Sequence, residues 1–368
     1  MIIYYVYPMH HDVSFKYVAL EHIKMLKTKY TVYDIPELNF YQFTPFGKPL
    51  TFVHPFFYGM VNWTKIQWAF FKMYRSKVKQ LIGVEVADSD RIADNFINIA
   101  NSWADALVVN SRWSYDAYVK SGLKIPVYMV QHNYDPKLEM PDEKLKVSQE
   151  IRKIADKKKE KHIKVVLFFS WHSGYRKGDD LFQKIARKIQ KERDDVYFLV
   201  KSPMPRSDLA DLRLINVTGV VPFDDIVELY RIADITLLLS RGGSFELNGL
   251  ESLVSGTPTI APDEGPWVEY FPPALRHLLA KTAAHPIVLP DNPIHIGHGV
   301  EVGIDDVTEK ALKILDNIEE EKAKVKSQIG FFRENYSFNA IKNKLLGVVS
   351  QIVGENTEKN KIALRNMP

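Results

Sequence analysis

The chain has 368 residues, 46% hydrophobic and 26% charged, which is typical of globular domains with real cores. This length predicts two domains of ordinary size. The absence of cysteine excludes disulfides and thiolate sites, and a net charge of +4 gives no reason to expect a nucleic acid as partner. The first residues do not have the pattern of a signal peptide, and no apolar run could span a bilayer, so we expect a cytoplasmic protein.

Strand and helix patterns alternate through the first half of the chain. This alternation predicts a parallel sheet with helices on both faces. The expected strands are 2–6, 50–53, 81–86, 106–109 and 127–130, and the expected helices are 15–26, 92–103 and a segment that Ser111 caps and that ends near Gly122.

A charged stretch, 135–164, separates this half from a second series of strands and helices. We expect an exposed helix and a connection between two domains there. The second series has strands at 165–169, 196–201 and 235–239 and helices at 179–191 and 223–233. The predicted organisation is a first domain at 1–140, a second domain at 160–336, a long helix at 337–353 and a polar tail at 354–368.

The most informative segment runs from Ser240 to Pro262. A predicted strand leads into a loop with two adjacent glycines and then into a short helix that contains Glu251 and ends at Gly256. Such a turn presents free backbone N–H groups and the positive end of a helix dipole to an anion. A carboxylate about two turns into the helix could accept hydrogen bonds from a ribose diol. The layout predicts a site for a nucleoside diphosphate.

This segment resembles the donor-site signature of the GT-B glycosyltransferases, especially glycosyltransferase family 4, which reads E-G-F-G-x-x-x-x-E-A-x-A-x-G-T-P-V. Phe245, Glu251 and 256–258 match it. Gly243 stands where the family has its first glutamate, and Glu246 stands where the family has glycine. Whether Glu246 replaces the missing carboxylate is open at this point. The resemblance implies that Gly243, Ser244, Phe245 and Glu251 bind the donor nucleotide, and we assign Glu246 to the sugar and to catalysis.

A basic turn opens the first helix of the second domain. Arg176, Lys177 and Gly178 combine a bidentate donor, a point charge and a residue that lets backbone approach a ligand, so they predict a phosphate clamp. The turn resembles the family's G-R-x-x-x-x-K-G segment. The family arginine falls on His172, so either His172 or Arg176 takes that role. Arg241 is either a further phosphate contact or the partner of a neighbouring carboxylate.

The segment 83–91 follows a predicted strand of the first domain, at the strand end where α/β proteins bind ligands. Glu85 is the candidate base that takes the proton of the acceptor, whereas Ser89 and Asp90 are expected to cap a helix. His10, His11 and Asp12 are adjacent, and adjacent residues rarely converge on one ion. We therefore predict no metal site and favour a polar loop.

The segment 63–79 mixes aromatic and basic side chains. As a helix it would lie on an anionic membrane or form a core helix with a basic outer face. The second arrangement is the commoner one, and peripheral membrane contact is kept as a minority hypothesis.

The resemblance implies two Rossmann-like domains that face each other across a cleft, with a C-terminal helix that crosses back to the first domain. It also implies a retaining transferase that uses a nucleoside-diphosphate sugar and an acceptor hydroxyl on a glycan, lipid or protein. No cofactor and no essential metal are expected, because basic side chains and a helix dipole would neutralise the leaving diphosphate. Two alternatives stay open: a non-catalytic protein that binds nucleotide sugars or glycans, and a sugar-nucleotide epimerase of the same fold.

Overall fold

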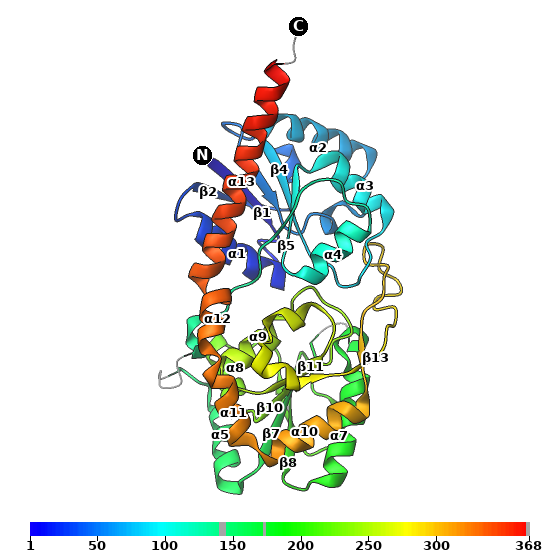
Figure 1. Cartoon of the computed structure of the whole chain (residues 1–368), viewed down its shortest axis with the longest axis vertical. Coiled ribbons are helices and arrows are strands. Elements are labelled where there is room, and N and C mark those ends of the chain that lie inside the picture. The colour runs from blue at the N-terminus through cyan, green and yellow to red at the C-terminus, as the bar shows by residue number, and fades with distance from the viewer. Residues whose placement is uncertain (140–144, 172–173, 366–368) are drawn as a thin grey trace. The chain divides into compact units, whose positions relative to one another are not determined.

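The computed structural model describes residues 1–139, 145–171 and 174–365, with backbone alone from 355 onward. The chain forms two compact units. Unit 1 comprises 1–133, 291–296 and the chain from Phe338 onward; unit 2 comprises 134–290 and 297–337. Each unit contains one six-stranded parallel sheet (Figure 1). Unit 2 is thus inserted into unit 1, and its two ends meet, because the Tyr134 amide donates to the Tyr336 carbonyl at 3.2 Å.

The sheet of unit 1 has the strand order β2-β1-β3-β4-β5-β6, and every neighbouring pair is parallel. Its side chains alternate between two cores, as the period of a strand requires: Ile3 and Tyr5 enter one core and Val6 enters the other. The strands are β1 (Ile2–Tyr7), β2 (Thr31–Pro36), β3 (Leu50–Val53), β4 (Gln80–Glu85), β5 (Ala106–Val109) and β6 (Val127–Met129).

Helices cover both faces of this sheet. On one face lie α1 (Ser14–Leu26) and α13 (Phe338–Arg365), whose Ile341 and Leu345 are fully buried in the core that Tyr5 enters. Figure 1 shows α13 running beside α1. The C-terminal helix therefore returns to the first domain, as expected. The opposite face carries α2 (Lys65–Lys77), α3 (Asp94–Trp103) and α4 (Arg112–Lys120).

Unit 2 repeats the doubly wound plan with the strand order β12-β11-β10-β7-β8-β9. Its strands are β7 (Lys164–Phe169), β8 (Val196–Ser202), β9 (Leu214–Thr218), β10 (Ile235–Leu237), β11 (Thr259–Pro262) and β12 (Leu279–Ala280), and β13 (Thr282–Ala284) pairs with β14 (Glu301–Val302). The helices are α5 (Gln149–Lys161), α6 (Gly174–Lys177), α7 (Asp179–Glu192), α8 (Phe223–Ile232), α9 (Leu247–Val254), α10 (Ile304–Asp316), α11 (Ile318–Ser327) and α12 (Ile329–Tyr336).

The expected α/β architecture is confirmed, and the main differences lie at the sheet edges and the C-terminus. The edge strands β2 and β9 were not expected, and α13 continues to Arg365 where we expected a polar tail. The charged stretch between the domains does contain a helix, α5. Among the described residues, no helix combines the length and the apolar character needed to cross a membrane.

Glu85 ends β4 as a buried carboxyl group inside unit 1. One oxygen accepts from the Phe57 amide at 2.5 Å and the other from the Val86 amide at 3.0 Å. Burial raises the pKa of this carboxyl from its usual 4.5 to about 8, although the backbone hydrogen bonds oppose the shift. Glu85 thus ties the chain after β3 to the end of β4. Its catalytic role stays a prediction.

The raised pKa of Glu85 predicts a pH dependence of stability. Its folded pKa lies above its unfolded value, so its stabilising contribution is complete below pH 4.5 and is lost as the pH rises through 8, at up to about 1.4 kcal/mol per pH unit. Urea unfolding from pH 4 to 9 should show this decline, and Glu85→Gln should flatten it. The exposed Asp90→Asn should keep the wild-type slope; an unchanged slope in Glu85→Gln would contradict the assignment.

Candidate functional site

The turn between β7 and α7 in unit 2 lies against the chain that follows β10. Gly178 occupies the N-cap of α7 with φ +80°, a region that favours glycine. A Cβ atom at this position would lie 2.2 Å from the carbonyl oxygen of Leu239. Glycine is therefore required here, and the close approach brings the two glycine-bearing turns of the sequence together.

Two cations of the first turn converge on one carboxylate of the second. Lys177 Nζ binds Glu246 Oε2, and Arg176 Nη1 lies 3.4 Å from Glu246 Oε1 while it donates to the Gly242 carbonyl at 2.9 Å. The side chains of Glu246 and Arg176 are 4% and 8% exposed, whereas that of Lys177 is 19% exposed. Low exposure strengthens their mutual attraction. His172, the other residue considered for this role, lies outside the described residues.

Gly243 and Glu246 fit each other. A Cβ atom on Gly243 would lie 2.2 Å from Glu246 Oε1, so the carboxylate fills space that any side chain at 243 would enter. Glu246 adopts φ +62°, a conformation that favours glycine, the residue that the family pattern has at this position. The two departures from the pattern are therefore complementary, because the glycine at 243 makes room for the glutamate at 246.

Aromatic residues hold this loop in place. The Tyr270 hydroxyl donates to the Glu246 carbonyl at 3.1 Å. A Cβ atom on Gly249 would lie only 2.2 Å from the same hydroxyl oxygen, so glycine at 249 leaves room for Tyr270. Phe245 is buried, with its ring centroid 5.4 Å from that of Tyr270 and 6.1 Å from that of Tyr336. Phe245 thus anchors the loop. Sequence reasoning missed Tyr270, because it follows the motif in a segment without a recognisable pattern.

Glu251 lies on α9, one helix turn beyond the loop. Its Oε2 accepts from the Tyr230 hydroxyl at 2.8 Å. Burial raises the pKa of this carboxyl and the charge of Asp135 adds to the effect, while the Tyr230 hydrogen bond opposes it. Tyr230, on α8, thereby fixes the direction of the carboxylate. No pattern in the sequence pointed to this partner.

The side chain of Arg241 binds carboxylates other than Glu246. Its guanidinium makes a bidentate contact with Asp180 at 2.7 and 2.8 Å and donates to Glu301 at 2.5 Å. It also lies over the Tyr175 ring, 4.0 Å from the centroid, and is 2% exposed. This arrangement is the second of the two alternatives for Arg241, the pairing with carboxylates. Its role in phosphate binding stays a prediction.

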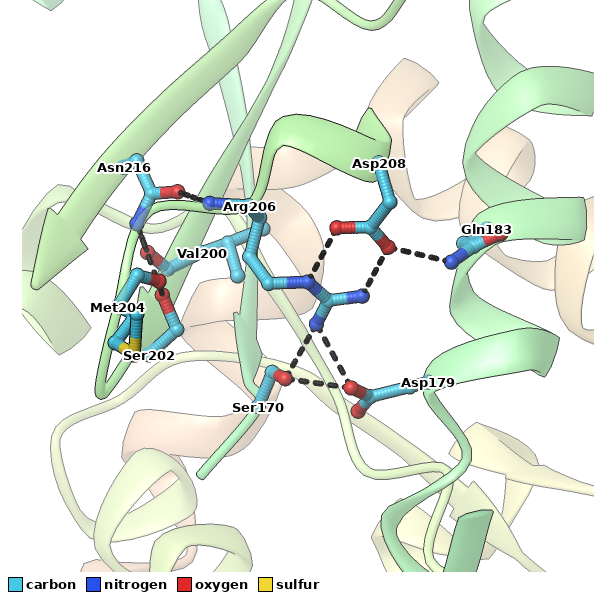
Figure 2. A network of polar contacts seen from close by, with 9 residues as sticks. All are labelled: Ser170, Asp179, Gln183, Val200, Ser202, Met204, Arg206, Asp208 and Asn216. Atoms are coloured by element: carbon cyan, nitrogen blue, oxygen red, sulfur yellow. Dashed lines mark hydrogen bonds and ion pairs between the residues drawn. The ribbon is translucent and has the colours of Figure 1, made fainter. Parts of the chain in front are cut away.

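A further cation, Arg206, organises the start of α7. Figure 2 shows its guanidinium between Asp208, bound at 2.7 and 2.8 Å, and Asp179, bound at 2.8 Å. Ser170 at the end of β7 also donates to Asp179, at 2.7 Å. The network thus fixes the turn that carries Lys177. Its position in the loop after a predicted strand could have drawn attention to Arg206.

The structure therefore brings together Arg176, Lys177, Gly178, Gly243 and Glu246, while Ser244 and Phe245 belong to the same loop. Glu85 belongs to unit 1, whereas this cluster belongs to unit 2. No group of histidine, aspartate or glutamate side chains suited to a metal ion occurs in the described part of the chain. Metal independence stays a prediction.

The pairing of Arg241 leads to a stability prediction. Arg241→Met should lower the free energy of unfolding by about 1–3 kcal/mol, because it removes the charge-assisted hydrogen bonds to Asp180 and Glu301, whose carboxylates keep access to water. Urea unfolding measures this loss, and the exposed Lys184→Met on α7 should stay within about 0.5 kcal/mol of wild type. A phosphate contact predicts the opposite pattern: little loss of stability and a large loss of nucleoside diphosphate affinity in the folded variant.

Comparisons with known proteins agree with this architecture. Residues 163–282, within unit 2, match the family described as glycosyl transferases group 1. Protein 356 of Sulfolobus islandicus rod-shaped virus 1, itself uncharacterised, is 51% identical over 349 residues, which are 95% of this chain and 98% of that protein. A candidate glycosyltransferase of the Sulfolobus islandicus filamentous virus is 25% identical over 262 residues, 69% of each chain.

Among solved structures, HepE of Anabaena in complex with UDP-glucose has a TM-score of 0.65 at 13% identity, covering 95% of this chain and 100% of its own. Similarity at this identity concerns the fold. The chain is a glycosyltransferase of the GT-B fold that carries the group 1 domain in residues 163–282, and it belongs to the same family as protein 356 of the rod-shaped virus.

Proposed function

We propose that this glycosyltransferase moves a sugar from a nucleoside-diphosphate sugar to an acceptor hydroxyl with retention of anomeric configuration. The observation that carries the proposal is the convergence of Arg176 and Lys177 on one carboxylate beside the N-terminus of α9. Two cations and a helix N-terminus are the groups that a diphosphate requires. HepE, which was solved with UDP-glucose, makes this nucleotide sugar the first donor to test.

In this proposal Glu246 acts as a built-in counter-ion. Without donor, its carboxylate neutralises part of the charge of Arg176 and Lys177. The donor diphosphate competes for the same cations, and a displaced Glu246 can then accept hydrogen bonds from the sugar. Glu251, held by Tyr230, accepts from the ribose hydroxyls. Glu246 would in this way replace, as the carboxylate that binds the sugar, the glutamate that the family has at position 243.

The chemistry follows from these placements. The acceptor oxygen forms a bond to the anomeric carbon on the face from which the diphosphate leaves, and the bond between that carbon and the diphosphate oxygen breaks. The acceptor proton passes to the departing diphosphate, so this scheme does not use Glu85, the base expected from the sequence. Arg176, Lys177 and the backbone N–H groups stabilise the charge that develops on the leaving group. No metal ion is needed in this scheme.

The main test compares Lys177→Ala with Glu246→Gln. Lys177→Ala should weaken UDP binding by about 1.5–3 kcal/mol, a loss of roughly ten- to hundredfold in affinity. Glu246→Gln should instead bind bare UDP more tightly, because the competing charge is gone, and should transfer glucose from UDP-glucose more slowly. Titration calorimetry and a transfer assay measure the two effects. If Glu246→Gln weakens UDP binding, Glu246 is no counter-ion to the clamp.

Turnover separates the proposal from its alternatives. With EDTA present, the protein should still hydrolyse or transfer the donor sugar, and NMR of the product should give the anomeric configuration of the donor. Binding without turnover would favour the non-catalytic alternative, and release of an epimerised sugar nucleotide would favour the epimerase. Activity that EDTA abolishes and a divalent cation restores would contradict the metal-free scheme.

We also propose peripheral contact with an anionic membrane through α2. Its Ile66, Phe70 and Met73 are 70%, 42% and 56% exposed and recur at the spacing of one helix face. Exposed Lys65 and Lys72 accompany them, and α2 contains no acidic residue. An apolar stripe with basic neighbours favours binding at the surface of anionic lipid.

Sedimentation with vesicles tests this contact. The protein should sediment with phosphatidylglycerol vesicles more than with phosphatidylcholine vesicles, and the double variant Phe70→Ser/Met73→Ser should lose at least half of the bound fraction. Val220→Ser removes an apolar side chain of unit 2 that is still more exposed, at 85%, and should bind like wild type. Equal binding by the two variants would exclude α2 as the contact.

A further inference from the structure

Glu251 has one carboxylate oxygen bound and the other open. Its Oε2 accepts from the Tyr230 hydroxyl at 2.8 Å. Its Oε1 has no hydrogen-bond partner in the described part of the chain, yet it is not one of the side-chain atoms that are closed to water. Glu251 as a whole is half-buried. Oε1 is therefore an acceptor that a ligand hydroxyl can reach.

The place of Glu251 on its helix relates this open oxygen to the phosphate clamp. Glu246, which binds Arg176 and Lys177, is the N-cap of α9, and Glu251 lies on the same helix. Five residues of α-helix give a rise of about 7.5 Å. A nucleoside diphosphate with its phosphates beside the N-terminus of α9 can thus reach Glu251 with its ribose, which offers two adjacent hydroxyl donors.

Tyr230 is held by both its ring and its backbone. The residue is fully buried, and its ring centroid lies 5.5 Å from that of Phe169 at the end of β7. Its carbonyl accepts from Thr257 Oγ1, beyond the end of α9, at 2.7 Å. Because the ring and the backbone are both fixed, the hydroxyl has one position, and it gives the Glu251 carboxylate one direction.

The charge of Glu251 depends on the same hydroxyl. Burial raises the pKa of this carboxyl and so works against its ionised form, and the charge of Asp135 adds to the effect. The Tyr230 hydrogen bond acts in the opposite direction and favours the ionised form. An ionised carboxylate accepts stronger hydrogen bonds than a neutral carboxyl group does. Tyr230 thus directs the acceptor and also keeps it strong.

We propose that Tyr230 is a positioning residue for donor selection: by holding Glu251, it makes the enzyme select nucleotides with an intact ribose diol over nucleotides that lack it. The inference rests on the proposed function, since it takes the donor to be a nucleoside-diphosphate sugar. A site built to bind a hydroxyl rejects ligands without one, because its polar group then loses its partner. Tyr230 is fully buried, so it acts through Glu251 and not by contact with the ligand.

Titration calorimetry with UDP and 2′,3′-dideoxy-UDP, which lacks the diol, tests this selection. The wild type should bind UDP more tightly, by about tenfold or more. Tyr230→Phe keeps the buried ring and loses the hydroxyl, so it should bind UDP about tenfold more weakly and dideoxy-UDP like wild type. Equal weakening of both ligands would show a merely structural role and overturn the proposal.

A matched control comes from unit 1. Tyr118 is also fully buried, and its hydroxyl donates to the Val86 carbonyl at 2.9 Å. Tyr118→Phe therefore removes a buried hydroxyl bond far along the chain from α9, and it should keep the wild-type preference for UDP. A loss of preference in Tyr118→Phe equal to that in Tyr230→Phe would overturn the specific role of Tyr230.

A double-mutant cycle tests whether Tyr230 acts through Glu251. Glu251→Ala should lose the preference for UDP, and adding Tyr230→Phe should then change UDP affinity by less than about twofold. A further tenfold loss in the double variant would overturn the positioning role. With UDP-glucose, Tyr230→Phe should raise KM with little effect on kcat, because the ribose contact is the same in the ground state and the transition state. A loss in kcat alone would overturn the proposal.

The outcomes in the wild type separate this inference from the proposed function. The ribo- and dideoxy forms of GDP and ADP extend the comparison to other bases. Diphosphate binding without any preference for the diol would refute the role of Glu251, and this inference with it, but leave the phosphate clamp intact. If the protein bound no nucleoside diphosphate, the proposed function would fail and this inference would fail with it.

Discussion

The contact between Glu246 and the two cations of the basic turn is the constraint on which the donor site depends. It joins the turn after β7 to the loop after β10, and it is held where water has little access. Such a group of buried charges is stable only when every member has its partner. Much of the surrounding sequence follows from that requirement: glycine at 243 leaves room for the carboxylate, glycine at 178 lets the turns touch, and Tyr270 secures the backbone of Glu246.

The same contact accounts for the two departures from the family pattern. A side chain at 243 would require the Glu246 carboxylate to move from its present place beside the two cations. The left-handed backbone of residue 246 costs about 1–2 kcal/mol for a residue other than glycine. The ion pairs and the Tyr270 hydrogen bond hold Glu246 in it.

Sequence patterns predicted the fold well where hydrophobic periodicity was strong. The buried strands β3 and β5 begin and end where their apolar runs do. The edge strands β2 and β9 were missed, because edge strands are partly solvated and lack a continuous apolar run. The motifs located Lys177 and Glu246, but no pattern in one sequence shows that the two bind each other. Tyr230, Tyr270 and Arg206 come from other elements, so only the tertiary structure relates them to the site.

The insertion of unit 2 into unit 1 has a consequence for folding during synthesis. Unit 2 is complete once the ribosome has passed Ser337, and its ends are already joined by the Tyr134–Tyr336 hydrogen bond. Unit 1 is synthesised first, yet the face of its sheet that α1 covers in part is complete only when Ile341 and Leu345 of α13 emerge. N-terminal domains usually fold first during synthesis. Here unit 2 can complete its fold before unit 1, although unit 1 begins the chain. While unit 2 is being made, the part of this face that α13 will cover leaves apolar surface open to aggregation.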